Sequence, residues 1–212
     1  MQKRILCFGD SNTYGYTPSG GRYDENTRWP MRLNRELGSE FTVIEEGFNG
    51  RTCVFDDPVE GGYKSGVKYL PPCLMTHNPL DAVLLMLGTN DTKKRFGMTP
   101  MTIGQAMMQL VHTAKLYAVN EAGKTSRIII VAPPPILGNL MQTRHAECFG
   151  EQAIEVSRGL SMEYRRISKL MRCDFFDAGP YAEPSTLDAV HLTGESHIRL
   201  AVALAEKLRA VL

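Results

Sequence analysis

The sequence has few cysteines, and their spacing suggests no pairing. There are five of them, an odd number, and no two stand in a C-x-x-C pattern. This argues against a disulfide framework and against a zinc site built from closely spaced thiols. Free thiols are typical of a reducing compartment, so we expect a cytoplasmic protein. The cysteines are Cys7, Cys53, Cys73, Cys148 and Cys173.

Long hydrophobic runs are also missing. No stretch approaches the roughly 20 apolar residues that a membrane-spanning helix needs. The apolar run Ile5–Phe8 near the start is too short for the core of a signal peptide, and no small-residue cleavage site follows it. We therefore expect neither a membrane partner nor a secretion leader.

An excess of charge of either sign is absent as well. Lysine and arginine number 24 and aspartate and glutamate 23, which leaves a formal net charge of +1. Without a basic stripe, nucleic acid and anionic membranes are not expected partners. The densest basic run, Lys93–Arg95, is predicted to be a solvated loop.

What is present indicates an ordinary globular domain. The 212 residues are 43% hydrophobic and 22% charged, enough to build a substantial core. No internal repeat, low-complexity tract or interdomain linker interrupts the chain. We therefore predict a single domain over residues 1–212.

Short apolar runs alternate with longer segments compatible with helices. Near-continuous hydrophobic runs are typical of parallel strands that are covered on both faces. Strands alternating with helices predict a three-layer α/β/α fold, flavodoxin-like, with a five-stranded parallel sheet. The predicted strands are Arg4–Phe8, Thr42–Glu46, Ala82–Leu87, Arg127–Ala132 and Asp174–Asp177. The predicted helices are Trp29–Leu37, Thr102–Ala122, Glu147–Leu170 and Gly194–Val211.

Two long segments rich in glycine or proline are predicted to be loops. They are Gly50–Pro79 and Pro133–Arg144. Both follow predicted strands, and open α/β sheets bind ligands at the carboxyl ends of their strands. Long loops in a compact domain are often functional. We therefore expect these two segments to border a binding site.

A serine follows the first predicted strand, in the sequence Gly9-Asp10-Ser11-Asn12. At the start of a helix, its hydroxyl can point into a cleft beside free backbone N–H groups. A serine is a weak nucleophile without a base, and Ser11 could equally be a helix cap. Asp10 is expected to be structural, bonding nearby backbone.

A candidate base lies near the other end of the chain. Asp188 and His191 stand three residues apart, just before the last predicted helix. An imidazole near Ser11 could take its proton, while the carboxylate holds the ring in the required tautomer. D-x-x-H also occurs by chance in loops. No other histidine has such a partner in an equivalent position, and His112 and His197 are expected at the core edge or surface.

Two further turns could supply donors for an oxyanion. Gly50 follows the second predicted strand, and a glycine there lets its backbone N–H approach a substrate. Asn90 follows the third strand and could donate its side-chain amide. With the N–H of Ser11 these would form a three-donor oxyanion hole. Each sequence is also a good ordinary turn.

These blocks occur in one order along the chain, and together the sequence resembles the SGNH/GDSL hydrolase family. The matching blocks are Gly9-Asp10-Ser11, Gly50, Gly88-Thr89-Asn90-Asp91 and Asp188 with His191. The resemblance implies a triad of Ser11, Asp188 and His191, an oxyanion hole of Ser11, Gly50 and Asn90, and no metal or cofactor. One departure is Asn12, where the motif usually has leucine; we expect it to alter local packing and not chemistry.

Within that family the sequence looks closest to the small arylesterases and acyltransferases. The stretches that carry this likeness are Lys3–Ser11, Val43–Gly47, Tyr69–Leu74, Met86–Lys93 and Phe175–Gly179. The likeness implies a homo-oligomer of up to eight subunits. Relatives that favour acyl transfer can carry tryptophan beside the nucleophile, whereas this chain has Tyr14 and Tyr16.

The function implied is hydrolysis of short-chain acyl and aryl esters through an acyl-enzyme, with transfer to alcohols as a further activity. Asn49, Tyr16 and Val190 are the expected substrate-binding residues, and Phe149 or Phe175 could also line the acyl pocket. A carbohydrate acetylesterase is an alternative with the same triad. A non-catalytic, flavodoxin-like binding module is an alternative of a different class, because fold does not dictate function.

Overall fold

The computed structural model describes residues 2–212, and its centre is a parallel five-stranded sheet. The strands lie in the order β2-β1-β3-β4-β5, and every neighbouring pair is parallel. This confirms the predicted sheet, with ends of β1, β2 and β3 shifted by one residue. The strands are β1 (Lys3–Gly9), β2 (Phe41–Gly47), β3 (Ala82–Met86), β4 (Arg127–Ala132) and β5 (Asp174–Asp177).

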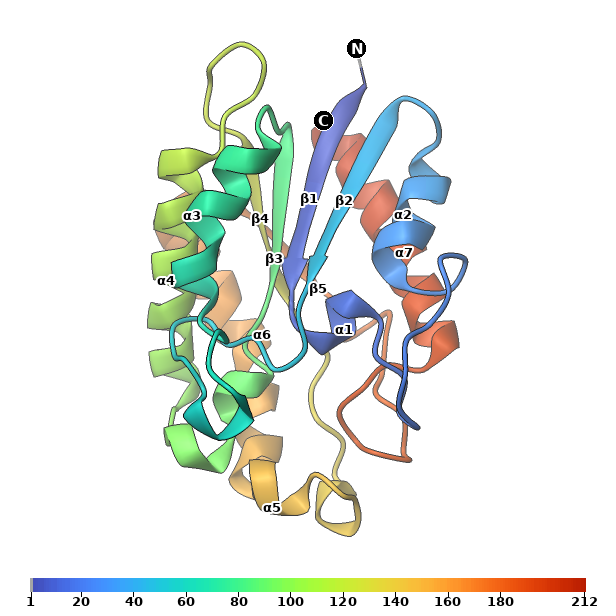
Figure 1. Ribbon diagram of the computed structural model, residues 1–212, viewed down its shortest axis with the longest axis vertical. Coiled ribbons are helices and arrows are strands. Elements are labelled where there is room, and N and C mark those ends of the chain that lie inside the picture. Colours follow the sequence, from blue (N-terminus) through green and yellow to red (C-terminus); the bar gives the residue numbers. More distant parts are fainter. Residues whose placement is uncertain (1) are drawn as a thin grey trace.

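Helices cover both faces of the sheet and complete the predicted three layers (Figure 1). One face carries α3 (Gly66–His77), α4 (Pro100–Tyr117) and α6 (Gln152–Met171), and the other α2 (Trp29–Leu37) and α7 (Gly194–Val211). The short helices α1 (Ser11–Tyr14) and α5 (Ala146–Phe149) lie near the carboxyl ends of the strands, at the opposite end from the two termini.

The alternation of side chains along each strand explains the two cores. In β3, Val83 and Leu85 pack with α3, α4 and α6, whereas Leu84 and Met86 pack with α2 and α7. All four side chains are buried. Because successive residues of a strand point to opposite faces, a continuous apolar run is what a strand between two helical layers requires.

The prediction of one uninterrupted loop over Gly50–Pro79 was wrong, because that segment contains α3. Pro71 and Pro72 stand inside this helix, where proline removes backbone hydrogen bonds. Burial outweighs that cost, since Leu70 and Leu74 are fully buried against the sheet. Tertiary packing here overrides a weak local preference.

Two predicted helices also have different ends in the structure. The helix predicted over Thr102–Ala122 begins at Pro100, after a capping box at Thr99, and stops at Tyr117. The helix predicted over Glu147–Leu170 is divided into α5 and α6, because Gly150 adopts a positive φ of 73°. Both segments contain good helix formers. In each, the helix begins or ends at residues that the spacing of apolar residues does not distinguish.

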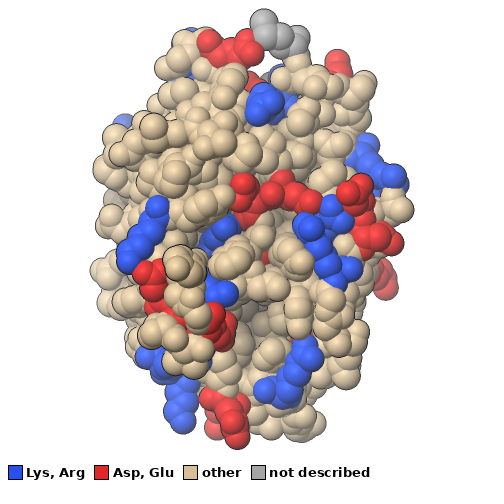
Figure 2. Space-filling model, in the orientation of Figure 1, with Lys and Arg blue, Asp and Glu red and all other residues tan. Residues whose placement is uncertain are grey.

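The basic run Lys93–Arg95 is only in part the solvated loop that was predicted, because Lys93 is buried. The side chain of Lys93 is buried, and its Nζ lies 2.6 Å from Oε1 of Glu60. Arg95 pairs with Asp57 at 2.6 Å. Lys94 and Arg95 are both exposed. On the face shown in Figure 2, acidic and basic side chains lie close together and neither sign forms a broad patch.

The last helix holds a histidine in the core, contrary to the expected place at the core edge or surface. His197 is fully buried, and its Nδ1 accepts a hydrogen bond of 3.2 Å from the N–H of Trp29. Burial lowers the pKa of His197 to about 3, so the ring is neutral at ordinary pH. His112, by contrast, is exposed. Among the described helices, none is both long and apolar enough to cross a bilayer.

Candidate active site

The nucleophile candidate is fixed by the sharp turn from β1 into α1. Gly9 is required there, because a Cβ would lie 2.0 Å from Oγ1 of Thr13. The side chain of Asp10 caps α1 by accepting a hydrogen bond of 2.9 Å from the N–H of Asn12. Burial raises the pKa of Asp10 to about 7. These contacts fit the structural role expected of Asp10 and leave the Ser11 hydroxyl facing the pocket.

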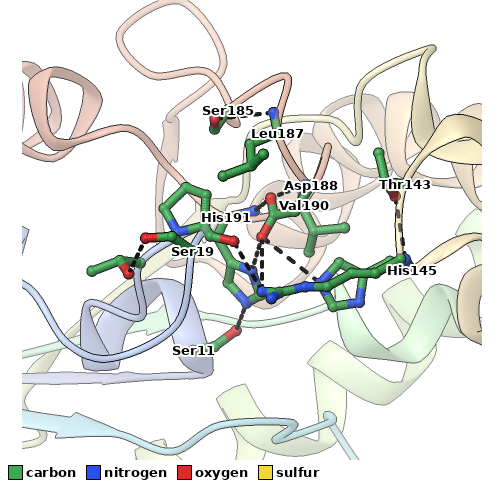
Figure 3. Close-up of polar contacts among 12 residues, drawn as sticks. Ser11, Ser19, Thr143, His145, Ser185, Leu187, Asp188, Val190 and His191 are labelled. Atoms are coloured by element: carbon green, nitrogen blue, oxygen red, sulfur yellow. Dashed lines mark hydrogen bonds and ion pairs between the residues drawn. The ribbon is translucent and has the colours of Figure 1, made fainter.

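Ser11, His191 and Asp188 form a continuous chain of hydrogen bonds (Figure 3). The Oγ of Ser11 lies 3.0 Å from Nε2 of His191, and Nδ1 of His191 lies 2.6 Å from Oδ2 of Asp188. The other oxygen of Asp188 accepts hydrogen bonds from the N–H groups of Val190 and His191. The carboxylate is therefore held in place by its own turn, and the imidazole is oriented toward the serine.

A second imidazole lies beside the same carboxylate, which the sequence reasoning missed. Nε2 of His145 and Nη2 of Arg144 each lie 3.7 Å from Oδ2 of Asp188, and the rings of His145 and His191 meet edge to face. Figure 3 shows Asp188 facing both rings. Burial would raise the pKa of Asp188, but the bonds from His145 and His191 outweigh it and hold that pKa well below its usual range.

Asn12 holds the histidine loop by hydrogen bonds, a more specific role than the local packing expected at this position. Its Nδ2 donates to the carbonyl oxygen of Val190 at 3.2 Å, and its Oδ1 accepts from the N–H of Leu192 at 3.0 Å. The side chain is 2% exposed. These two bonds clamp the residues on either side of His191, and leucine could make neither.

Replacing Asn12 with leucine is expected to lower both stability and turnover. The carbonyl of Val190 and the N–H of Leu192 would lose buried partners, which costs about 2–4 kcal/mol of unfolding free energy in total. Looser placement of His191 should also reduce kcat by about tenfold. Urea denaturation and ester kinetics measure the two effects, with the exposed Asn26→Leu as the control. Unchanged stability and kcat in Asn12→Leu would show that the clamp contributes nothing.

The predicted oxyanion donors Gly50 and Asn90 line the same pocket as Ser11. Asn90 donates one amide hydrogen to the carbonyl of Arg51 at 3.1 Å, which fixes the side chain and leaves its second hydrogen available. Gly50 has φ of 78°, and a Cβ there would lie 2.7 Å from Oε2 of Glu60. Within residues 2–212 the N–H of Gly50 makes no hydrogen bond.

A cavity of about 230 Å³ opens over the serine. The expected substrate-binding residues Asn49, Tyr16 and Val190 all line it, and so does Phe149. Phe175 does not: it packs against the core and the guanidinium of Arg165. The structure thus brings together every predicted site residue except Phe175.

The cavity also has a charged wall that the sequence did not reveal. Glu60 and Lys93 line it and pair with each other at 2.6 Å. Cys148 completes this wall, with its Sγ 3.4 Å from Nη1 of Arg95. The basic run containing Lys93 was visible in the sequence, but its pairing with Glu60 depends on the course of the loop after β2. The Oδ1 of Asn49 is buried and accepts no hydrogen bond from the described residues.

One group of possible metal ligands coincides with this site. Donor atoms of His145, Asp188 and His191 lie within 4.8 Å of one another. The shortest contact in the group, 2.6 Å between Asp188 and His191, is the hydrogen bond that orients the imidazole toward Ser11. An ion bound through Nδ1 of His191 would break that bond, so the arrangement suits proton transfer and not metal binding.

The sequence and fold of this chain are shared by a known protein family and by several solved structures. The sequence model of the GDSL-like lipase/acylhydrolase family matches residues 7–198, which include every member of the Ser11, Asp188 and His191 chain. A search of curated proteins found no match.

Several solved structures share both fold and sequence. Est24, a carbohydrate acetylesterase from Sinorhizobium meliloti, has 36% identity and a TM-score of 0.93, with full coverage of both chains. The aryl esterase of M. smegmatis has 38% identity and a TM-score of 0.91, covering 99% of this chain and 100% of its own. A putative arylesterase from Agrobacterium tumefaciens str. C58 has 35% identity and a TM-score of 0.90, with full coverage of both chains.

Proposed function

This chain belongs to the GDSL-like lipase/acylhydrolase family and is a carboxylic ester hydrolase, and on that premise we propose that Ser11, His191 and Asp188 are its catalytic triad. One observation carries the proposal. The hydroxyl of Ser11, the imidazole of His191 and the carboxylate of Asp188 form an unbroken chain of hydrogen bonds at the floor of a cavity. That is the arrangement in which a serine hydroxyl becomes a nucleophile.

The proposed mechanism proceeds through an acyl-enzyme. His191 takes the proton of Ser11 as its oxygen attacks the ester carbonyl, and Asp188 stabilises the imidazolium that forms. The N–H groups of Ser11 and Gly50 and the free amide hydrogen of Asn90 bind the oxyanion. His191 then protonates the leaving alcohol. Water, deprotonated by the same imidazole, then attacks the acyl-enzyme and releases the acid. When an alcohol attacks in place of water, the acyl group is transferred to that alcohol.

The size of the cavity supports short acyl groups as substrates. About 230 Å³ is below the range of pockets that enclose drug-sized ligands, and aromatic and aliphatic side chains narrow it. The ring of Tyr16 lies 4.7 Å from that of His191, centroid to centroid, and Val190 is directly before the histidine. We therefore propose acetyl-type esters of aryl and alkyl alcohols as substrates, with Tyr16, Asn49 and Val190 in contact with them.

A carbohydrate acetylesterase is the second candidate, and one feature favours it. The Oδ1 of Asn49 is an unused acceptor, and the pair of Glu60 and Lys93 forms a polar wall on the same cavity. Sugar hydroxyl groups could donate to the carboxylate of Glu60, which lines the cavity, whereas an aryl ring could not. Est24 carries the name of such an enzyme.

A panel of esters tests both candidates. We expect kcat/KM for p-nitrophenyl esters to fall at least about tenfold from butyrate to octanoate, because each extra methylene must fit a small pocket. Acetylated sugars, and aryl acetate with added alcohol, are measured in parallel. Equal turnover of acetate and octanoate would refute the small acyl pocket. A higher kcat/KM for acetylated sugars than for aryl acetate would favour the second candidate.

We also propose that the chain forms a homo-oligomer, as its resemblance to the small arylesterases suggests. Phe48, Tyr63 and Tyr69 are exposed aromatic side chains that line one cavity together, and Phe55, in the same segment of the chain, is also exposed. Clustered exposed aromatics are typical of interaction surfaces. The five free thiols support a cytoplasmic location for this assembly.

Light scattering tests the assembly. The wild type should have a mass several times that of one chain, and Tyr63→Asp should shift it toward the monomer, because burying an unpaired carboxylate is costly. Met162 is similarly exposed but lies on α6, so Met162→Asp is the matched control. A monomeric wild type, or equal masses for the wild type and both variants, would contradict this surface.

A further inference from the structure

A cysteine, a histidine and a glutamate converge between β2 and α3. Cys73 and His77 are four residues apart in α3, so they lie on the same face of the helix. Glu46 in β2 faces them, with its Oε1 2.9 Å from Nε2 of His77. One donor atom from each of the three side chains lies within 4.8 Å of the other two. A sulfur, a nitrogen and an oxygen ligand thus surround one small volume.

We propose that Glu46, Cys73 and His77 form a binding site for a divalent transition-metal ion, with zinc the ion that suits it best. Zinc binds thiolate, imidazole and carboxylate groups at about 2.0–2.3 Å, which places such ligands roughly 3–4 Å from one another. Calcium and magnesium prefer oxygen ligands alone. A thiolate and a carboxylate balance the two charges of the ion, and water takes the fourth position.

The burial of the three side chains suits an ion that enters from solvent. Cys73 is 3% exposed, whereas the side chains of Glu46 and His77 are 19% and 27% exposed. The thiol therefore lies at the bottom of the site and the other two ligands at its mouth. Glu46 also lines a cavity of about 750 Å³, which offers a path for the ion.

The carboxylate of Glu46 is free to bind an ion despite a nearby guanidinium. Arg51 donates to the main-chain carbonyls of Gly9 and Glu46 and makes no hydrogen bond to the carboxylate. The carboxylate contacts His77, and the hydroxyl of Tyr69 donates to its second oxygen at 3.3 Å. An entering ion would replace the contact with His77, displace the thiol proton of Cys73 to water, and keep Tyr69 as an orienting partner.

The position of the site indicates what a bound ion would do to the structure. It would join α3 to β2 just before Gly47, where the chain enters the segment that carries Gly50. The site includes none of the residues proposed to act on the ester. We therefore expect zinc to stabilise the folded chain and hydrolysis to proceed without it.

Cobalt spectroscopy on the metal-stripped protein tests the proposal. Adding Co²⁺ to the wild type should produce the near-ultraviolet absorption of a cobalt thiolate, with one ion per chain, and Zn²⁺ should abolish it by displacement. Cys73→Ser should lose the band and bind at least about 100-fold more weakly, and Cys173→Ser, the matched control, should keep it. His77→Gln should weaken binding as well. Zn²⁺ should raise Tm in the wild type and leave Tm of Cys73→Ser unchanged.

These experiments distinguish ion binding at this site from ion binding at the triad and from unfolding of the variant. The group of His145, Asp188 and His191 has no sulfur, so an ion bound there gives no thiolate band and inhibits hydrolysis in every variant. Ester hydrolysis by metal-free Cys73→Ser reports that the variant is folded. Absence of the band in the wild type, or its persistence in Cys73→Ser, would overturn the proposal.

Discussion

Replacing Ser11 with alanine is expected to reduce kcat for p-nitrophenyl acetate by about 10⁴- to 10⁶-fold, because no acyl-enzyme can form without the hydroxyl. What remains would come from the oxyanion donors and from binding. The fold should be retained, since within residues 2–212 the only side-chain hydrogen bond of Ser11 is the one to His191. Steady-state kinetics and thermal unfolding of the same samples measure the two properties.

Covalent labelling supplies the control for this result. A fluorophosphonate probe should add to Ser11 in the wild type, as mass spectrometry of the peptide would show, and should not label Ser11→Ala. Ser19 is an exposed serine in the loop after α1, so Ser19→Ala should keep both labelling and activity. Hydrolysis by Ser11→Ala at the rate of the wild type would remove Ser11 from the mechanism.

Replacing Asp188 with asparagine is expected to reduce kcat by about 10⁴-fold with little loss of stability. An amide oxygen can still accept the N–H groups of Val190 and His191, so the turn survives. An amide nitrogen facing Nδ1 of His191 would instead require that atom to accept a hydrogen bond. The ring would then carry its proton on Nε2 and could not take one from Ser11.

The neighbours of Asp188 make this variant informative in a second way. His145 and Arg144 lie 3.7 Å from its carboxylate, so removing the charge also removes their partner. If the charge matters mainly to those two groups, Asp188→Asn would lower Tm while kcat changes less than about tenfold, and the triad assignment would fail. Kinetics, together with Tm of the double variant Asp188→Asn/His145→Gln, decide between the two results.

Helices and strands with a regular pattern of apolar residues could be predicted from the sequence. The apolar runs of β1, β3 and β4 follow from burial on both faces of a sheet, and the bounds of α2 and α7 agree with the structure. The helix α3 was missed because its two prolines argue locally against a helix, whereas the burial of Leu70 and Leu74 that stabilises it is a tertiary effect.

The residues of the candidate site also divide into those that the sequence indicated and those that it did not. Ser11, Gly50, Asn90, Asp188 and His191 stand at strand ends or in short motifs, where residue type and position indicate chemistry. His145 and Lys93 reach the site only through the course of the loops around them, and no local pattern distinguishes them from surface residues. Asn12 was visible as a departure from the motif. Its two hydrogen-bond partners, Val190 and Leu192, are far from it in the sequence, so no local pattern indicates them.

The separation of Ser11 and His191 by 180 residues has a consequence for how the protein is made. During synthesis the nucleophile emerges well before its base and the loop that Asn12 clamps, which follow about 180 residues later. That loop leads into α7, which packs against α2 and closes one face of the sheet. A nascent chain that has not yet reached His191 therefore carries an inert serine, and reactivity begins only when the histidine loop has been made and α7 has docked.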